Sequence, residues 1–209
     1  MTVIIDYDAG NTHSVINALR ALGEDPVLSA DMEVIRDAKR LILPGVGAFG
    51  DAMKRLRERK LDIAIKEAVS RGIPLLGICL GQQLLLSSSE ESPGAAGLGI
   101  IPGVCRRIPA SKGIKVPQIG WNSLSFPMKG KLFGEAYRRE KEEGSRSYVY
   151  FVHSYYTDVE DRSVVCAETF HGIAIPAALE KDNVFACQFH PEKSGDTGLA
   201  ILSAFLGQG

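Results

Sequence analysis

Short aliphatic runs alternate with amphipathic stretches through the first half of the chain. The runs at residues 2–6, 26–29, 40–43 and 73–78 predict strands, and the stretches at 15–22, 51–59 and 61–71 have the apolar spacing of helices. Strands that alternate with helices in this way are typical of βαβ units. We therefore predict an α/β fold with a mostly parallel central sheet flanked by helices.

The pattern changes beyond residue 92, where the apolar runs become shorter and several alternate. We predict strands at residues 123–126, 149–152, 164–168, 173–179 and 184–188, as antiparallel additions to the sheet in the C-terminal half. Residues 129–147 are dense in Lys, Arg, Glu and Gly and predict an exposed loop or short helix. With no internal repeat, the 209 residues suit a single domain over residues 1–209.

Composition narrows the classes of partner. A balance of 24 Lys+Arg against 25 Asp+Glu leaves no general attraction to nucleic acid or to a membrane surface. The apolar runs are far too short to span a bilayer, and no export signal is visible. The four cysteines lie far apart without a C-x-x-C pair, which disfavours a zinc site or a disulfide framework. We expect no metal, no cofactor and a reducing, cytoplasmic location.

The strongest local motif surrounds Cys79, where a hydrophobic strand gives way to a helical pattern. Glycines lie two residues before and two residues after the cysteine, at Gly77 and Gly81. Such glycines allow a tight strand-to-helix turn that projects a nucleophile into a cleft, and a helix N-terminus favours the thiolate. The alternative is that Cys79 is one more small buried apolar residue.

A second motif, His190-Pro191-Glu192, follows the last predicted strand. A cysteine nucleophile needs a base that takes its proton, and this base needs an orienting acceptor on its other ring nitrogen. His190 and Glu192 match these two roles, and no other histidine has a carboxylate so placed. Taken alone, His190 would be interpreted as a surface histidine or a buried one with its hydrogen bonds satisfied, and it is the motif around Cys79 that favours the catalytic interpretation.

A tetrahedral intermediate also needs backbone N–H donors for its negative oxygen. The N–H of Leu80 follows the nucleophile directly, and the Gly45-Val46-Gly47 segment after a strand is the clearest source of a second donor. That segment could instead be a phosphate-binding loop, but it lacks both the Gly-Lys-Ser/Thr ending and the G-x-G-x-x-G spacing that such loops have.

These motifs resemble the triad, or class I, glutamine amidotransferases over nearly the whole chain. Within that group the chain is most similar to the glutaminase subunits of imidazole glycerol phosphate synthase. The segments that carry this narrower resemblance are residues 6–11 with 14–15, 44–50, 117–122 and 150–156. The resemblance implies a flavodoxin-like fold and the release of ammonia from L-glutamine through a Cys79 thioester.

The resemblance also implies roles for residues that the chemistry alone does not assign. Gly47 and Leu80 would form the oxyanion hole, while Gln83, Ser154 and Tyr155 would bind glutamine. A further set would lie on the face that meets a (β/α)8-barrel cyclase, namely Asn11, Trp121, Asn122 and Lys193. In this family the cyclase uses the ammonia with N'-phosphoribulosylformimino-AICAR to make imidazole glycerol phosphate and AICAR in histidine biosynthesis.

Three other interpretations remain open. The chain could be the glutaminase of another pathway, such as pyridoxal phosphate synthase. It could be a cysteine peptidase or deglycase on a similar scaffold, although Glu192 together with Gln83 disfavours this. It could also be a non-catalytic binding module. Such a module has no need for Cys79, His190 and Glu192 to occur together, so their joint presence disfavours this alternative.

The chain departs from the family pattern at four places. Asp8 stands where a glycine is expected, Gln82 where methionine is usual and Gln118 where histidine is frequent. The charged segment 129–147 is also longer than the family pattern leads us to expect. None of these departures removes a catalytic group, so they bear on the partner face and on loop geometry.

Overall fold

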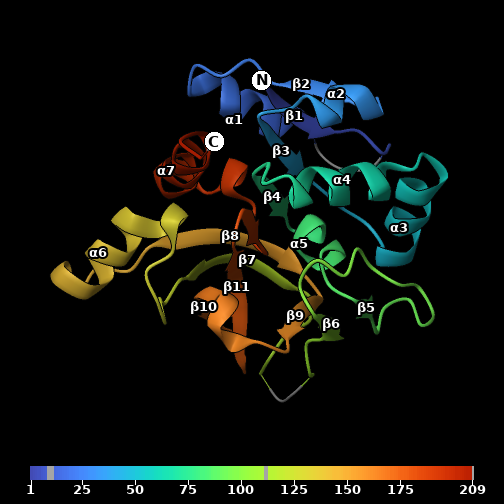
Figure 1. The fold of residues 1–209 in the computed structure, drawn as a ribbon. Helices are drawn as coiled ribbons and strands as arrows, with labels where there is room; N and C mark the ends of the chain where they lie inside the picture. The colour runs from blue at the N-terminus through green and yellow to red at the C-terminus, as the bar shows by residue number, and fades with distance from the viewer. Residues whose placement is uncertain (9–11, 111–112, 209) are drawn as a thin grey trace.

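Seven strands form the central sheet of the computed structural model, which describes residues 1–8, 12–110 and 113–208 (Figure 1). The strands are β1 Thr2–Ile5, β2 Val27–Ser29, β3 Arg40–Leu43, β4 Leu75–Ile78, β10 Val165–Phe170, β11 Ala174–Lys181 and β12 Val184–Cys187, in the order β10-β11-β12-β4-β3-β1-β2. Neighbours from β2 to β12 pair in parallel, whereas β11 pairs antiparallel with both β12 and β10. The predicted parallel sheet with antiparallel additions is confirmed.

Helices cover both faces of this sheet because its strands bury side chains on both sides. The helices are α1 Thr12–Ala21, α2 Met32–Arg36, α3 Phe49–Glu58, α4 Leu61–Ser70, α5 Leu80–Leu84, α6 Gly134–Glu143 and α7 Gly195–Leu206, with 3₁₀ turns η1 Lys131–Phe133, η2 Arg162–Val164 and η3 Pro191–Lys193. Along β1, Val3 and Ile5 belong to the cluster that contains α3 and α4, and Ile4 belongs to the cluster that contains α1 and α7.

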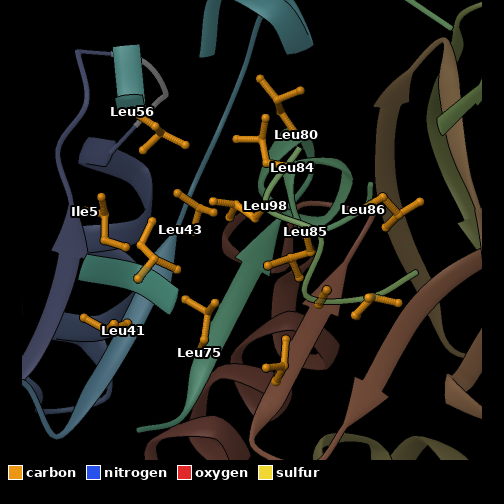
Figure 2. Close-up of a cluster of buried hydrophobic side chains, with 14 of the residues drawn as sticks. Ile5, Leu41, Leu43, Leu56, Leu75, Leu80, Leu84, Leu85, Leu86 and Leu98 are labelled. Carbon is orange, nitrogen blue, oxygen red and sulfur yellow. The ribbon is translucent and has the colours of Figure 1, made fainter. Parts of the chain in front are cut away.

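Leucine is the commonest residue in the core beneath α3 and α4 (Figure 2). Leu43 from β3 and Leu75 from β4 contribute to the same cluster as Leu80 and Leu84 from α5, and all four are at most 3% exposed. Burying each leucine side chain contributes roughly 1.5–3 kcal/mol to the free energy of folding. The short helix α5 is therefore fixed by its core contacts, and with it the residue that precedes it, Cys79.

Two smaller sheets lie apart from the central one. One contains β5 Ser88–Ser89, β6 Gly103–Arg107 and β9 Tyr155–Val159, and the other pairs β7 Gln118–Ser123 with β8 Tyr148–His153. The strand predicted at residues 123–126 is wrong, since the strand runs over 118–123. The alternation of apolar residues at 123–126 arises because Leu124 and Phe126 are buried in the core, each 2% exposed. The backbone there forms only an isolated bridge at Ser125 and no strand.

Other elements only partly match the prediction. The segment 129–147 forms η1 and α6, which is the short helix of the two predicted alternatives, with a charged outer face and a buried Ala136. Helix α7 was not predicted, although its Ile201, Leu202 and Phe205 are buried in the core. Strand β8 pairs with β7 and does not extend the central sheet.

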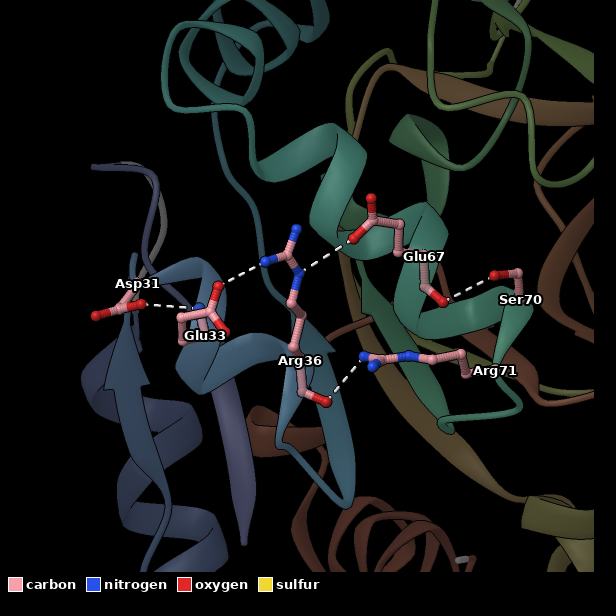
Figure 3. A network of polar contacts seen from close by, with 6 residues as sticks. All are labelled: Asp31, Glu33, Arg36, Glu67, Ser70 and Arg71. Atoms are coloured by element: carbon pink, nitrogen blue, oxygen red, sulfur yellow. Dashed lines mark hydrogen bonds and ion pairs between the residues drawn. The ribbon is translucent and has the colours of Figure 1, made fainter.

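Polar contacts link α2 to α4 on the surface (Figure 3). The Arg36 guanidinium contacts Glu33 at 2.5 Å and Glu67 at 3.1 Å, and Arg71 donates to the Arg36 carbonyl oxygen at 2.8 Å. Exposed pairs of this kind contribute little stability, about 0–1 kcal/mol each. Within the described ranges, no helix has the length and apolar character needed to cross a membrane.

Candidate active site

Cys79 lies in the tight turn between β4 and α5. Its backbone has φ 55° and ψ −108°, a conformation that residues with a side chain rarely adopt. A Cβ on Gly81 would lie 1.9 Å from the Leu43 carbonyl oxygen, and one on Gly77 would lie 2.9 Å from the Gly81 backbone. Both predicted glycines are therefore sterically required, and the turn has the strand-to-helix form that the sequence predicts.

The surroundings of the Cys79 sulfur are polar but weakly bonded. The Sγ atom lies 3.9 Å from the Val152 carbonyl oxygen and 3.9 Å from the Gln188 side-chain nitrogen. Helix α5 has only five residues, so its N-terminal partial charge is smaller than the sequence led us to expect. The stronger stabilising neighbour for a thiolate is the imidazole of His190.

His190 and Glu192 form a buried pair. His190 Nδ1 lies 2.7 Å from Glu192 Oε1, and the two side chains are 3% and 1% exposed. Burial lowers the pKa of His190, but the neighbouring Cys79 and Glu192 outweigh it and raise this pKa to about 9. Because Nδ1 is held by Glu192, Nε2 is the nitrogen left for proton exchange; it is buried and has no hydrogen-bond partner among the described residues.

A cavity of about 320 Å³ brings Cys79 and His190 together. Its lining contains every residue predicted for the oxyanion hole and for substrate binding, namely Gly47, Leu80, Gln83, Ser154 and Tyr155. Glu192 lies behind His190 and does not line the cavity. A larger cavity of about 460 Å³, between α6 and α7, contains none of the predicted site residues.

The predicted oxyanion donors are not both directed at the cavity. The N–H of Leu80 donates to the Gly45 carbonyl oxygen at 3.4 Å. A Cβ on Gly45 would lie 2.9 Å from Leu80 Cβ, so this residue must be glycine for lack of space, whereas Gly47, with φ 96°, is open and needs glycine for its backbone conformation. Residues 44–48, here called the glycine loop, thus place a carbonyl oxygen on one of the two predicted donors.

Comparison with known proteins identifies the family. Residues 3–208 match the family described as "Glutamine amidotransferase class-I". This chain belongs to that family. A relative from Streptococcus sanguinis, "Imidazole glycerol phosphate synthase subunit HisH", is 51% identical over 98% of this chain and 95% of its own. A relative of the same name from Methanothermobacter thermautotrophicus is 46% identical over 99% of this chain and 98% of its own.

Solved structures support the same fold at low sequence identity. The "Structure of PurLQS from Thermotoga maritima" matches with a TM-score of 0.75 at 22% identity, over 99% of this chain and 97% of that one. A "Crystal structure of glutamine amidotransferase" matches with a TM-score of 0.72, also at 22% identity, over 97% of this chain and 98% of that one. The amidotransferase fold is therefore shared well beyond close relatives.

Gln83 connects the nucleophile's helix to the substrate side of the cavity in this amidotransferase. Its side-chain nitrogen donates to the Tyr155 carbonyl oxygen and to Gln188 Oε1, each at 3.0 Å. Gln188 in turn reaches Cys79. Sequence reasoning gave Gln188 no role, although it stands two residues before His190, and its complete burial marks it as part of the site's support.

Among the lining residues without a predicted role, two are titratable, Glu91 and His153. Glu91 is the only acidic side chain in that lining, and its Oε2 accepts the Phe49 N–H at 2.7 Å at the start of α3. His153 is buried, which lowers its pKa to about 4 and keeps it neutral, and its Nδ1 lies 2.9 Å from the Tyr155 carbonyl oxygen. Glu91 lies in no motif, and His153 lies within residues 150–156 but was given no role; only the fold brings both to Cys79.

Of the predicted partner residues, Trp121 lies on an exposed apolar face beside the cavity. Trp121 is 58% exposed on β7, edge-on to Tyr150 of β8, and Ile119 is 64% exposed. Lys193 is exposed on η3, which adjoins β8 because the His190 N–H donates to the Tyr150 carbonyl oxygen. Asn122 donates its side-chain amide to the Phe170 carbonyl oxygen, and Asn11 lies outside the described residues.

Proposed function

We propose that this amidotransferase is the glutaminase subunit of an imidazole glycerol phosphate synthase. It would hydrolyse L-glutamine and pass ammonia to a (β/α)8-barrel cyclase, which converts N'-phosphoribulosylformimino-AICAR into imidazole glycerol phosphate and AICAR. Residues 1–209 form one domain in this proposal. The observation that carries it is that Cys79 and the Glu192-bound His190 line one cavity, in a chain about half identical to synthase subunits named HisH.

In the first half-reaction, the Cys79 thiolate attacks the side-chain carboxamide carbon of glutamine. The raised pKa of His190 favours its protonated form at neutral pH, so Nε2–H is available to protonate the departing nitrogen. The carbon–nitrogen bond breaks, ammonia leaves, and a γ-glutamyl thioester remains on Cys79. Glu192 accepts the Nδ1–H throughout and stabilises the imidazolium.

In the second half-reaction, water attacks the thioester. His190, now neutral, takes a proton from this water at Nε2, the tetrahedral intermediate collapses, and the carbon–sulfur bond breaks to release glutamate and the thiolate. Neither step requires a metal or a cofactor. All four cysteines are free thiols, and a thiolate nucleophile needs a reducing environment, so we place the reaction in the cytoplasm.

The cavity lining favours a zwitterionic amino acid. The Glu91 carboxylate can pair with the α-ammonium group of glutamine, while Ser154 and Tyr155 border its backbone end. Gln83 fixes the Tyr155 main chain at this end through its 3.0 Å hydrogen bond.

The apolar face of β7 and β8 is the proposed docking surface for the cyclase. Val152 lines the cavity and is 36% exposed on the same strand pair as Trp121, so the cavity adjoins this face. Exposed tryptophan is enriched at interface centres. Ammonia released at Cys79 then has a short path into a partner that covers Val152 and Trp121.

Free-running hydrolysis would waste glutamine, and the glycine loop offers a way to prevent it. As long as the Gly45 carbonyl oxygen accepts the Leu80 N–H, that donor is not available to an oxyanion. We expect the chain alone to release glutamate slowly and the liganded cyclase to accelerate it. Equal rates with and without the liganded cyclase would exclude this control.

The Cys79→Ala substitution tests the function directly. In complex with the cyclase, the variant should lose glutamine-dependent formation of imidazole glycerol phosphate but keep ammonia-dependent formation. Cys166→Ala, which removes a buried thiol on β10 away from the cavity, is the matched control and should keep both. Retention of glutamine-dependent synthesis by Cys79→Ala would refute the proposed nucleophile.

A further inference from the structure

Tyr7 lies directly beneath the glycine loop and is completely buried. It follows β1, and its hydroxyl donates a hydrogen bond of 2.7 Å to the carbonyl oxygen of Pro44, the first residue of the loop. Burial raises the pKa of Tyr7, and the nearby Cys79 raises it further, so the hydroxyl stays a donor at working pH.

The contacts of Gly45 connect this hydroxyl to the predicted oxyanion donor. A Cβ on Gly45 would lie 2.6 Å from Tyr7 Oη and 2.9 Å from Leu80 Cβ, so the backbone of the loop is packed between these two residues. Gly45 directly follows Pro44, and its carbonyl oxygen accepts the Leu80 N–H. Anchoring the Pro44 carbonyl fixes the peptide unit directly before the Gly45 carbonyl, and this limits how far the loop can shift to take that carbonyl away from Leu80.

The turn that carries Tyr7 is itself fixed to α3, the helix that the glycine loop enters. Asp8 has a positive φ of 58°, at the position where the family resemblance leads us to expect glycine. Its carboxylate pairs with Arg59, and its carbonyl oxygen accepts from Arg55. These contacts hold the Tyr7 backbone in place, so the hydroxyl acts from a rigid base.

We propose that Tyr7 is a positioning residue for the oxyanion site: its hydroxyl, through the Pro44 carbonyl, holds the glycine loop with the Gly45 carbonyl on the Leu80 N–H. The loop must give up this arrangement before Leu80 can donate to the reacting oxygen. Tyr7 thus sets how much of the enzyme is competent before a partner acts. The inference rests on the proposed glutaminase function.

The test is Tyr7→Phe, which keeps the ring and removes only the hydroxyl. Glutamate release is measured for the chain alone and for its complex with the cyclase and the cyclase's ribonucleotide ligand. We expect kcat of the chain alone to rise about tenfold, equivalent to about 1.4 kcal/mol, with KM for glutamine unchanged. The rate of the liganded complex should stay near wild type, so the activation ratio falls about tenfold.

Two further variants separate positioning from general loosening. Tyr137→Phe removes a hydroxyl from a partly buried tyrosine on α6 and should leave both rates unchanged. Arg59→Gln frees the Asp8 turn without touching Tyr7 and should raise the rate of the chain alone in the same direction. Melting temperatures of all variants establish that the chains are folded at the assay temperature.

The outcomes distinguish this inference from the function beneath it. If the wild-type complex releases no glutamate, the proposed function fails and the role of Tyr7 fails with it. If the wild type is active and activated, but Tyr7→Phe has an unchanged or lower rate alone and an unchanged activation ratio, only the role of Tyr7 is refuted.

Discussion

The buried pair of His190 and Glu192 makes the pH dependence of the reaction predictable. Glu192→Gln keeps an oxygen that can accept the Nδ1–H of His190 but removes the negative charge 2.7 Å away. Against the opposing effect of burial, Cys79 and Glu192 together raise the pKa of His190 from 6.5 to about 9, a net difference that corresponds to roughly 3 kcal/mol, so Glu192 accounts for part of it. A carboxylate this close shifts a partner's pKa by about 1–3 units. We therefore expect the variant's His190 to titrate one unit or more below wild type.

Protonated His190 is the acid that expels ammonia, so activity should fall as pH rises through its pKa. The assay is kcat/KM for glutamine from pH 6 to 10 in the activated complex. The wild-type alkaline limb should lie near pH 9. If the variant's limb lies near about 7.5, its activity at pH 8 falls roughly fourfold from protonation alone. Coincident alkaline limbs would show that Glu192 does not set the pKa of His190.

Unfolding provides an independent measurement of the same interaction. A histidine with a raised pKa contributes stability that is fully present below about pH 6.5 and is lost as pH rises through about 9. Glu192→Gln should therefore cost most stability near pH 6 and least near pH 10, as measured by urea denaturation. Glu160→Gln, on an exposed carboxylate, is the control and should show no such pH dependence.

Three other substitutions follow from single contacts. Glu91→Gln should raise KM for glutamine about tenfold or more with a smaller change in kcat, because the α-ammonium loses its charged partner while the Phe49 N–H keeps an acceptor; a KM within twofold of wild type would exclude the ammonium contact. Gly81→Ala places a Cβ 1.9 Å from the Leu43 carbonyl oxygen and should lower the unfolding free energy by about 3 kcal/mol or more, a claim that an unchanged urea midpoint would contradict. Trp121→Ala should weaken cyclase binding by roughly 2 kcal/mol in a titration without lowering the melting temperature, and unchanged affinity would place the interface elsewhere.

The parts of the site that the sequence predicts are those built within a few residues. Gly77 and Gly81 flank Cys79 at a fixed spacing that is visible in the sequence; the clash avoided at Gly77 is with the Gly81 backbone inside the same turn, whereas the clash avoided at Gly81 is with Leu43 on the neighbouring strand. Glu192 reaches His190 across a single proline. Parallel strands were also predictable, since their apolar runs are continuous when both faces are buried.

The parts that could not be predicted depend on contacts between distant segments. Glu91 reaches the cavity and the start of α3 across 42 positions, and nothing in its local pattern distinguishes it from an exposed acidic residue. The departures from the family pattern likewise acquire meaning only in the fold. Gln82, for example, is fully buried, and its side-chain nitrogen donates to Thr157 Oγ1 at 3.0 Å. A hydrogen bond thus occurs at a position where the family pattern leads us to expect an apolar side chain.

The strain at Cys79 and the state of the glycine loop have different physical origins. The positive φ of Cys79, which costs about 1–3 kcal/mol, persists because its N–H donates to Cys187 at 2.7 Å and Leu80 is buried on the following turn. The nucleophile is therefore positioned before any partner binds. The Leu80 N–H, in contrast, is directed at Gly45 by a 3.4 Å hydrogen bond, which is weaker and easier to exchange. Control of hydrolysis must then act on the glycine loop, because the backbone of Cys79 is already fixed in position.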